Sequence, residues 1–220
     1  MGKLIVFEGI DGSGKSTQFE LMCERLSSEN REFKRLVFPR YNEPSSALIK
    51  MYLGGDFGTD PDSVNAYAAS SFYAVDRYAS FVQDWRDYYE RGGLILTDRY
   101  TTSNALHQGA KIPAKRREIF FNWLYDYELN LMGLPVPDLV VYMDIEADFA
   151  EKRLKQRQAE TGTHADIHEN DIMYLKNCAE SGKQAAAQFG WHKINCIKDG
   201  IERDKDEMHE QIYKAIFEEH

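Results

Sequence analysis

Short apolar runs alternate with longer amphipathic stretches along the chain. Four of these runs have the length and the apolar content of buried strands, and a weaker fifth lies near the C-terminal end. They cover residues 4–7, 36–38, 94–97, 139–143 and 193–197. Strands that alternate with helices predict an α/β fold, in which a parallel sheet of about five strands has helices on both faces.

The stretches between these runs have helical periodicity and recognisable ends. Helices are predicted over residues 14–28, 62–91, 115–131, 148–158, 171–189 and 204–218. Pro61 precedes the second helix, Gly92-Gly93 ends it, and Gly133 stops the third. The length of 220 residues is enough for one α/β domain with a proper core, so residues 1–220 are expected to form a single domain. In parallel sheets ligands bind beyond the carboxyl ends of the strands, where we therefore look for chemistry.

The first predicted strand leads directly into the pattern G-x-x-x-x-G-K-[ST]. It is spelled Gly9-Ile10-Asp11-Gly12-Ser13-Gly14-Lys15-Ser16-Thr17. Glycines let backbone N–H groups turn toward phosphates, Lys15 can reach the β- and γ-phosphates, and Ser16 can ligate Mg²⁺. A chance match somewhere in the chain has odds of about one in a hundred. The pattern predicts a P-loop NTPase-type site for ATP and Mg²⁺, but it does not separate a kinase from an ATPase, a GTPase or a simple nucleotide binder.

Charged residues also follow two other predicted strands. Asp98 ends the third strand, where a second carboxylate near Mg²⁺ is expected. Arg99 beside it and Arg40 after the second strand lie where phosphates could be clamped. A surface ion pair is the plain alternative for Asp98 and Arg99, and arginines are common in loops. Two arginines at the same sheet edge as a phosphate loop are stronger evidence than either alone.

Two further pairs of residues are spaced four apart on predicted helices. Tyr73 and Arg77 could stack on a base and bond its edge, or they could be a core aromatic and a surface arginine. Arg153 and Arg157 precede a polar stretch, which predicts a small lid over about residues 153–170. Without a closed lid these arginines are expected to point to water, and a solvated charged helix is the alternative. His164 and His168, also four apart, have neither an HExxH context nor a cysteine partner, so we do not expect zinc there.

Composition restricts the remaining choices. A net charge of −9 argues against nucleic acid as a main partner, because phosphate backbones need basic surface. The three cysteines are far apart in sequence, which fits a reducing compartment. The N-terminal apolar run is too short for a signal peptide, and no run approaches the ~18 residues of a membrane span. We therefore expect a cytoplasmic protein with small-molecule partners and no membrane.

Taken together, the motifs resemble the thymidylate kinase (dTMP kinase) family. The resemblance is carried by Phe7-Glu8-Gly9 through Gln18, Phe38-Pro39-Arg40-Tyr41, Tyr73 with Asp76-Arg77, Asp98-Arg99-Tyr100, Ser103-Asn104-Ala105, Gln108-Gly109 and Asp166-Ile167-His168-Glu169. These segments cover nearly the whole chain in the right order. The resemblance implies transfer of the γ-phosphate of ATP to dTMP, giving dTDP and ADP, by a homodimer in dTTP biosynthesis.

The resemblance also implies a role for each matching residue. Asp11 would bond the 3′-hydroxyl of the acceptor, and Arg40 and Arg99 would hold its phosphate. Tyr73 would stack on thymine and Arg77 would bond the edge of the base. Asn104 and Gln108 would line the base and sugar side of the acceptor. Lys15 and Ser16 would serve ATP and Mg²⁺.

Two positions depart from the family pattern. Position 12 is Gly where one branch of the family has arginine, so the cation would come from Arg153 and Arg157 of the lid. His107 stands where a tyrosine is common, which leaves the exclusion of ribonucleotides open. Two other functions stay open at this point. One is a kinase for another nucleoside monophosphate or for a deoxynucleoside, and the other is a nucleotide-dependent switch.

Overall fold

Five parallel strands form the centre of the molecule. The computed structural model describes residues 1–58, 60–161 and 172–218. The strands are β1 (Lys3–Glu8), β2 (Lys34–Val37), β3 (Leu94–Asp98), β4 (Leu139–Asp144) and β5 (His192–Asn195). They are arranged in the order β2-β3-β1-β4-β5, and all four pairings are parallel. The α/β prediction and its five strands are therefore confirmed.

The central strand β1 explains why its sequence is a continuous apolar run. Leu4, Ile5, Val6 and Phe7 are all fully buried, because helices cover both faces of the sheet. In the register of the sheet, Phe7 is the partner of Asp98. The ends of β1 and β3 therefore lie side by side, and the segments that follow these strands meet at one edge.

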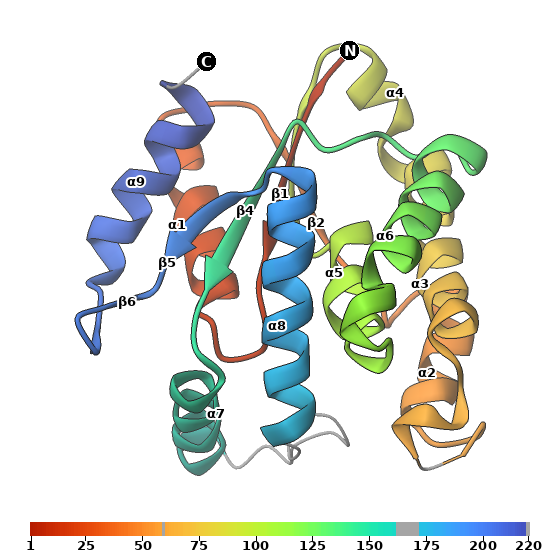
Figure 1. The fold of residues 1–220 in the computed structure, drawn as a ribbon. Coiled ribbons are helices and arrows are strands. Elements are labelled where there is room, and N and C mark those ends of the chain that lie inside the picture. The colour runs from red at the N-terminus through yellow and green to blue at the C-terminus, as the bar shows by residue number, and fades with distance from the viewer. Residues whose placement is uncertain (59, 162–171, 219–220) are drawn as a thin grey trace.

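Helices pack on both sides of this sheet (Figure 1). On one side lie α1 (Lys15–Ser28) and α9 (Lys205–Phe217), which contact each other. On the other side lie α5 (Thr101–His107) and α8 (Ile172–Phe189). Helices α2 (Ala47–Leu53), α3 (Ala66–Ser80) and α6 (Arg117–Tyr125) lie beyond α5, and α7 (Ala147–Thr161) follows β4.

The prediction of one continuous helix over residues 62–91 is wrong. Pro61–Ser63 form only a 3₁₀ turn, and α3 begins after Asn65, whose side chain accepts a hydrogen bond from the Ala68 amide at 3.0 Å. A π-helical turn, Phe81–Trp85, then separates α3 from α4 (Arg86–Glu90). The predicted helix over 115–131 likewise changes into a π-helical segment at Asp126–Leu131. Insertions of this kind often lie near functional sites.

Two helices were missed because each has only seven residues, too few to show a periodicity. One of them, α5, begins two residues after Arg99 and carries the predicted site residue Asn104, with Gln108 as its C-cap. The first part of the predicted lid belongs to α7, whereas residues 162–171, with His164 and the motif 166–169, lie outside the described residues. The lid therefore stays a prediction. Among the helices that the structure describes, none has the length and apolar character needed to span a membrane.

Candidate active site

The loop between β1 and α1 is shaped by left-handed glycines. Gly14 has a φ of 87° and stands immediately before α1, so the positive end of the helix faces the loop. Gly12 has a φ of 81°, and a Cβ there would lie 2.4 Å from the backbone oxygen of Ala150 in α7. Position 12 therefore cannot hold a side chain without moving the backbone, and an arginine could not be accommodated there.

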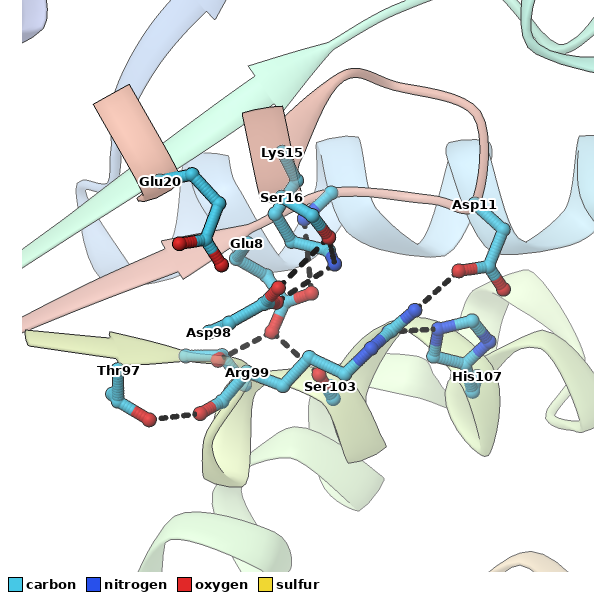
Figure 2. A network of polar contacts seen from close by, with 12 residues as sticks. Glu8, Asp11, Lys15, Ser16, Glu20, Thr97, Asp98, Arg99, Ser103 and His107 are labelled. Atoms are coloured by element: carbon cyan, nitrogen blue, oxygen red, sulfur yellow. Dashed lines mark hydrogen bonds and ion pairs between the residues drawn. The ribbon is translucent and has the colours of Figure 1, made fainter. Parts of the chain in front are cut away.

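Lys15, Ser16 and Asp98 converge beyond the ends of β1 and β3 (Figure 2). The Lys15 Nζ donates to Asp98 Oδ1 at 2.8 Å, and the Ser16 hydroxyl donates to Asp98 Oδ2 at 2.8 Å. Lys15 and Asp98 are both buried. The predicted phosphate lysine and the two predicted metal-ligating residues thus occupy one place, although Asp98 is far from the loop in sequence.

Arg99 crosses from the end of β3 to the phosphate loop. Its φ of 69° is left-handed, which is uncommon for a residue with a side chain. The backbone is held there because Arg99 N donates to Phe7 O at 3.1 Å and the Thr97 hydroxyl donates to Arg99 O at 2.7 Å. The guanidinium forms an ion pair with Asp11 and donates to His107 Nε2 at 2.8 Å, as Figure 2 shows.

The two partners of this ion pair stabilise each other's charge. Burial opposes the charge of Asp11, but Arg99, followed by His107 and Lys15, lowers its pKa well below the ordinary 3.8. Burial likewise opposes the charge of Arg99, yet Asp11, Glu8 and Asp98 together raise its pKa. Both groups are therefore ionised at neutral pH, and Arg99 is a permanent cation at the strand edge.

Two cavities open on either side of Asp11. The first, of about 380 Å³, is lined by residues 10–18 of the loop, by α7 and by the segment before α9. The second, of about 240 Å³, contains six of the predicted residues: Asp11, Tyr73, Arg77, Arg99, Asn104 and Gln108. We call them the donor cavity and the acceptor cavity. Because Asp11 lines both, ligands bound in the two cavities would adjoin each other.

The lid arginines of α7 face the donor cavity. The Nη1 of Arg153 donates to the carbonyls of Gly12 and Ser13 at 3.3 and 3.1 Å, and its Nε and Nη2 donate to Glu202 at 3.2 and 2.9 Å. The expectation that this arginine points to water is wrong, because two carbonyls of the loop and a carboxylate hold it. Arg157, one turn further along α7, lines the same cavity.

The acceptor cavity is built largely from buried polar side chains. Gln108 is 2% exposed, and its Oε1 has no hydrogen-bond partner within the described part of the chain. A buried acceptor without a partner is costly, so a ligand that donates to it would remove this cost. Arg77 is also 2% exposed and is paired with Glu128. The alternative of a surface arginine at position 77 is therefore wrong.

Arg40 is the one predicted acceptor residue that does not line this cavity. Its backbone N and its Nε donate to Asp76 at 2.8 and 3.3 Å, and its guanidinium also forms an ion pair with Asp84. The neighbouring Pro39 and Tyr41 do line the cavity. Arg40 thus lies at its margin, and its phosphate role stays a prediction.

Three carboxylates that organise the site were not singled out from the sequence. Glu8 is fully buried and accepts hydrogen bonds from Thr102 and Ser103 of α5, both at 2.7 Å. A glutamate at the end of an apolar strand could have drawn attention to it. Asp76 holds Arg40, and its position beside Arg77 was a comparable signal. Glu128 had no local signal at all.

The oxygens at the β3 end fit a magnesium ion. Ser16 Oγ and Asp98 Oδ2 lie 2.8 Å apart, so both can reach a single cation. Such hard oxygen donors, completed by phosphates and water, are what Mg²⁺ prefers. The described residues contain no group of three or more His, Cys, Asp or Glu that could hold a metal ion without a nucleotide.

Comparison with known proteins decides the family. The sequence model of the family described as thymidylate kinase matches residues 7–212. The chain belongs to the thymidylate kinase family. A thymidylate kinase from Mycobacterium tuberculosis is 31% identical over 190 residues, which are 86% of this chain and 87% of that protein. One from Dictyostelium discoideum is 30% identical over 219 residues, covering 98% and 88%.

A solved structure of thymidylate kinase from Candida albicans has the same fold. It superposes with a TM-score of 0.72 at 22% identity, and the match covers 98% of this chain and 91% of that one. Membership of the family makes this chain a dTMP kinase, an enzyme of nucleotide biosynthesis that uses ATP. The main prediction is thereby confirmed over the alternatives of another small-nucleotide kinase or a switch.

Proposed function

We propose that dTMP in the acceptor cavity receives the γ-phosphate directly from ATP in the donor cavity. The observation that carries this proposal is the meeting of the two cavities at Asp11, beside Lys15 and Arg99. Phosphoryl transfer requires the attacking and leaving oxygens to lie roughly in line across the transferred group. Adjoining cavities meet this requirement without a covalent intermediate on the protein.

On the donor side, the protein recognises phosphates chiefly through its main chain. The amides of residues 9–17, with the N-terminus of α1, surround the β- and γ-phosphates. When ATP binds, the Lys15 ammonium exchanges its contact with Asp98 for contacts with phosphate oxygens. Ser16 and Asp98 would hold Mg²⁺, which supplies charge neutralisation at the β- and γ-oxygens when it is bound.

On the acceptor side, charged and aromatic side chains do the work. Arg99, joined by Arg40 from the margin, holds the phosphate of dTMP, and Asp11 accepts from the sugar hydroxyl. Tyr73 stacks on thymine, and Arg77 donates to the base. Asn104 and Gln108 complete the base and sugar side. A cation held in place in advance, as Arg99 is by Asp11, costs little reorganisation when charge develops in the transition state.

The cation next to the transferring group comes from α7 in this proposal. Gly12 has no room for a side chain, whereas the Nη1 of Arg153 already reaches the loop at Gly12 and Ser13. Arg153 and Arg157 would stabilise charge on the phosphoryl group as it moves.

We further propose that the protein is a homodimer. Five large apolar side chains on α2, α3 and the π-helical turn after α3 are exposed, and a group of exposed apolar side chains is typical of a protein–protein interface. They are Leu48 (42%), Met51 (39%), Val75 (45%), Tyr78 (41%) and Val82 (41%). Val75→Asp and Val82→Asp, tested separately, should each convert the dimer into monomers, as measured by light scattering.

A cytoplasmic location stays a prediction, supported by three buried cysteines that form no disulfide.

The direct test is ATP consumption with a panel of acceptors. Purified protein with ATP and Mg²⁺ is offered dTMP, dUMP, dCMP, dAMP, UMP and thymidine in parallel. We expect the highest kcat/KM with dTMP and none with thymidine, because thymidine has no phosphate for Arg99. Preference for thymidine would contradict the assignment of the acceptor cavity. Hydrolysis that is independent of any acceptor would contradict direct transfer.

A further inference from the structure

Glu128 is a buried carboxylate that lines neither cavity. It lies in the π-helical segment Asp126–Leu131 and is fully buried. Arg77 donates to it twice, from Nε to Oε2 and from Nη2 to Oε1, both at 2.6 Å. The Thr101 hydroxyl donates to Oε2 at 2.7 Å, and Asn104 Nδ2 donates to Oε1 at 3.2 Å. One carboxylate therefore holds two side chains of the acceptor cavity.

This contact determines which atoms of Arg77 a ligand can use. A bidentate pair fixes the plane of the guanidinium, because two parallel N–H···O bonds allow one orientation. With Nε and Nη2 occupied, Nη1 is the nitrogen left over, and it makes no hydrogen bond to the described residues. Arg77 lines the acceptor cavity, so Nη1 is its donor for a bound base.

The same contact determines which end of the Asn104 amide is available. Asn104 Nδ2 donates to Ser70 O at 3.2 Å as well as to Glu128, so both of its hydrogens are used. The amide oxygen, Oδ1, is then the group left for a ligand. Asn104 also lines the acceptor cavity, where it would present an acceptor while Arg77 presents a donor.

A neighbouring donor and acceptor match only one kind of pyrimidine edge. Thymine and uracil have an accepting carbonyl at C4 and a donating N–H at N3. Cytosine has the reverse, a donating amino group at C4 and an accepting N3. If Asn104 could turn over, or if Arg77 could swing, the cavity would lose this polarity. Within the described part of the chain, Glu128 is the one hydrogen-bond partner of the Arg77 guanidinium.

We propose that Glu128 is a positioning residue for base selection: it holds Arg77 as donor and Asn104 as acceptor, so that the cavity admits thymine or uracil and rejects cytosine. The proposal rests on the assignment of the acceptor cavity to dTMP. A plain alternative is a buried ion pair that only attaches the π-helical segment to α3. The two differ in what happens to selectivity, since a structural ion pair affects every acceptor equally.

The test is Glu128→Gln, which preserves size but places an amino group among three donors. We expect kcat/KM for dTMP to fall about 10- to 100-fold, mostly through the KM for dTMP, with the KM for ATP unchanged. The ratio of kcat/KM for dTMP to that for dCMP should fall at least about tenfold. The rise in Tm that dTMP causes, measured against each variant's own ligand-free Tm, should fall in parallel without any turnover.

Two further variants make the outcome decisive. Glu29→Gln breaks the Arg25–Glu29 pair near the C-terminal end of α1, away from both cavities, and should leave the dTMP/dCMP ratio unchanged. Glu128→Asp retains the charge but shortens the reach, so it should recover part of the selectivity lost in Glu128→Gln. If Glu128→Gln does not fold, Glu128→Asp carries the test, with an expected loss of about threefold or more in selectivity against the wild type.

The possible results separate this proposal from the function on which it rests. A lowered ligand-free Tm with a dTMP/dCMP ratio within about twofold of wild type would overturn the role of Glu128. In that result the wild type still prefers dTMP, so the acceptor cavity keeps its assignment. If the wild type itself does not distinguish dTMP from dCMP, the assignment of the cavity fails, and the role of Glu128 fails with it.

Discussion

The donor and acceptor cavities are built in different ways. The donor cavity is formed mainly by one continuous segment, residues 10–18, whose glycines turn the main chain toward the ligand. The acceptor cavity is formed by side chains from α3, α5 and the end of β3. There, Arg77 is held by Glu128 and Arg99 by Asp11, and Arg40 at the margin of the cavity is held by Asp76.

The two cavities therefore orient their ligand-binding groups in two different ways, through the main chain in the donor cavity and through paired side chains in the acceptor cavity. Main-chain amides are oriented by local backbone conformation, so a short motif is sufficient. Long cationic side chains have many rotamers, and a fixed carboxylate removes that freedom before the substrate arrives. The donor cavity should therefore depend on a few loop residues, and the acceptor cavity also on ion-pair partners such as Glu128 and Asp76, which line neither cavity.

The largest effect is expected at the donor lysine. Lys15→Ala removes a cation that contacts the β- and γ-phosphates, and kcat should fall on the order of 10⁴-fold, as for other phosphate-bound cations. Stopped assays with dTMP and ATP, with circular dichroism to verify folding, measure this. A folded Lys15→Ala variant with near-normal turnover would remove the phosphate-loop assignment.

A smaller but still large effect is expected at α7. The double variant Arg153→Ala/Arg157→Ala should lower kcat on the order of 10³-fold, with little change in either KM. Lysine at these positions should restore only part of kcat, because it lacks the planar fork.

Lys155→Ala is the matched control for α7, since Lys155 is an exposed cation of the same helix that pairs with Glu151 and does not line the donor cavity. It should keep wild-type kcat. A double variant that also keeps wild-type kcat would mean that the catalytic cation lies elsewhere.

The third prediction compares the selectivity of the two cavities. We expect kcat/KM to decrease in the order dTMP, dUMP, dCMP, with dCMP at least about 100-fold below dTMP, because Arg77 cannot pair with an amino donor. Replacing ATP by GTP should change kcat/KM less than about tenfold, because the loop recognises phosphates. Equal kcat/KM for dTMP and dCMP would contradict the acceptor site, and strict ATP preference would contradict the contrast between the cavities.

The smallest effect concerns stability at the boundary of the two cavities. The pKa of Asp11 is lower in the folded protein than its ordinary 3.8, mainly because of Arg99. Its ion pair therefore stabilises the fold above about pH 4, and this contribution is lost as the pH falls further. Asp11→Asn should lower the free energy of unfolding at pH 7 by at most about 1 kcal/mol, since the pair is partly exposed.

Urea unfolding of wild type and Asp11→Asn at pH 7, 4 and 3 measures this difference. The difference in the free energy of unfolding should narrow toward pH 3, because below about pH 4 the Asp11 carboxyl takes up a proton in the unfolded chain before it does so in the folded protein, which destabilises the wild type but not Asp11→Asn. If the difference in the free energy of unfolding stays constant across this pH range, the charged form of Asp11 is not stabilised by Arg99.

The sequence predicted the parts of the site that depend on neighbours along the chain. The phosphate loop, the five strands and the Asp98-Arg99 pair at a strand end were all found from local patterns. Six of the seven predicted acceptor residues do line one cavity. The single long helix over 62–91 was wrong because the Asn65 cap and a π-helical turn interrupt it. Periodicity is too coarse to show either feature.

By itself the sequence determined the fold class, the phosphate loop and the residues that resemble a dTMP kinase. These follow from the alternation of apolar and polar positions and from backbone requirements that involve adjacent residues. Only the tertiary structure decided how the arginines are held. Glu128 contacts Arg77 although 51 positions separate them, and Arg153 reaches the loop 140 positions away. Such contacts form only when packing brings distant segments together, and no local pattern encodes them.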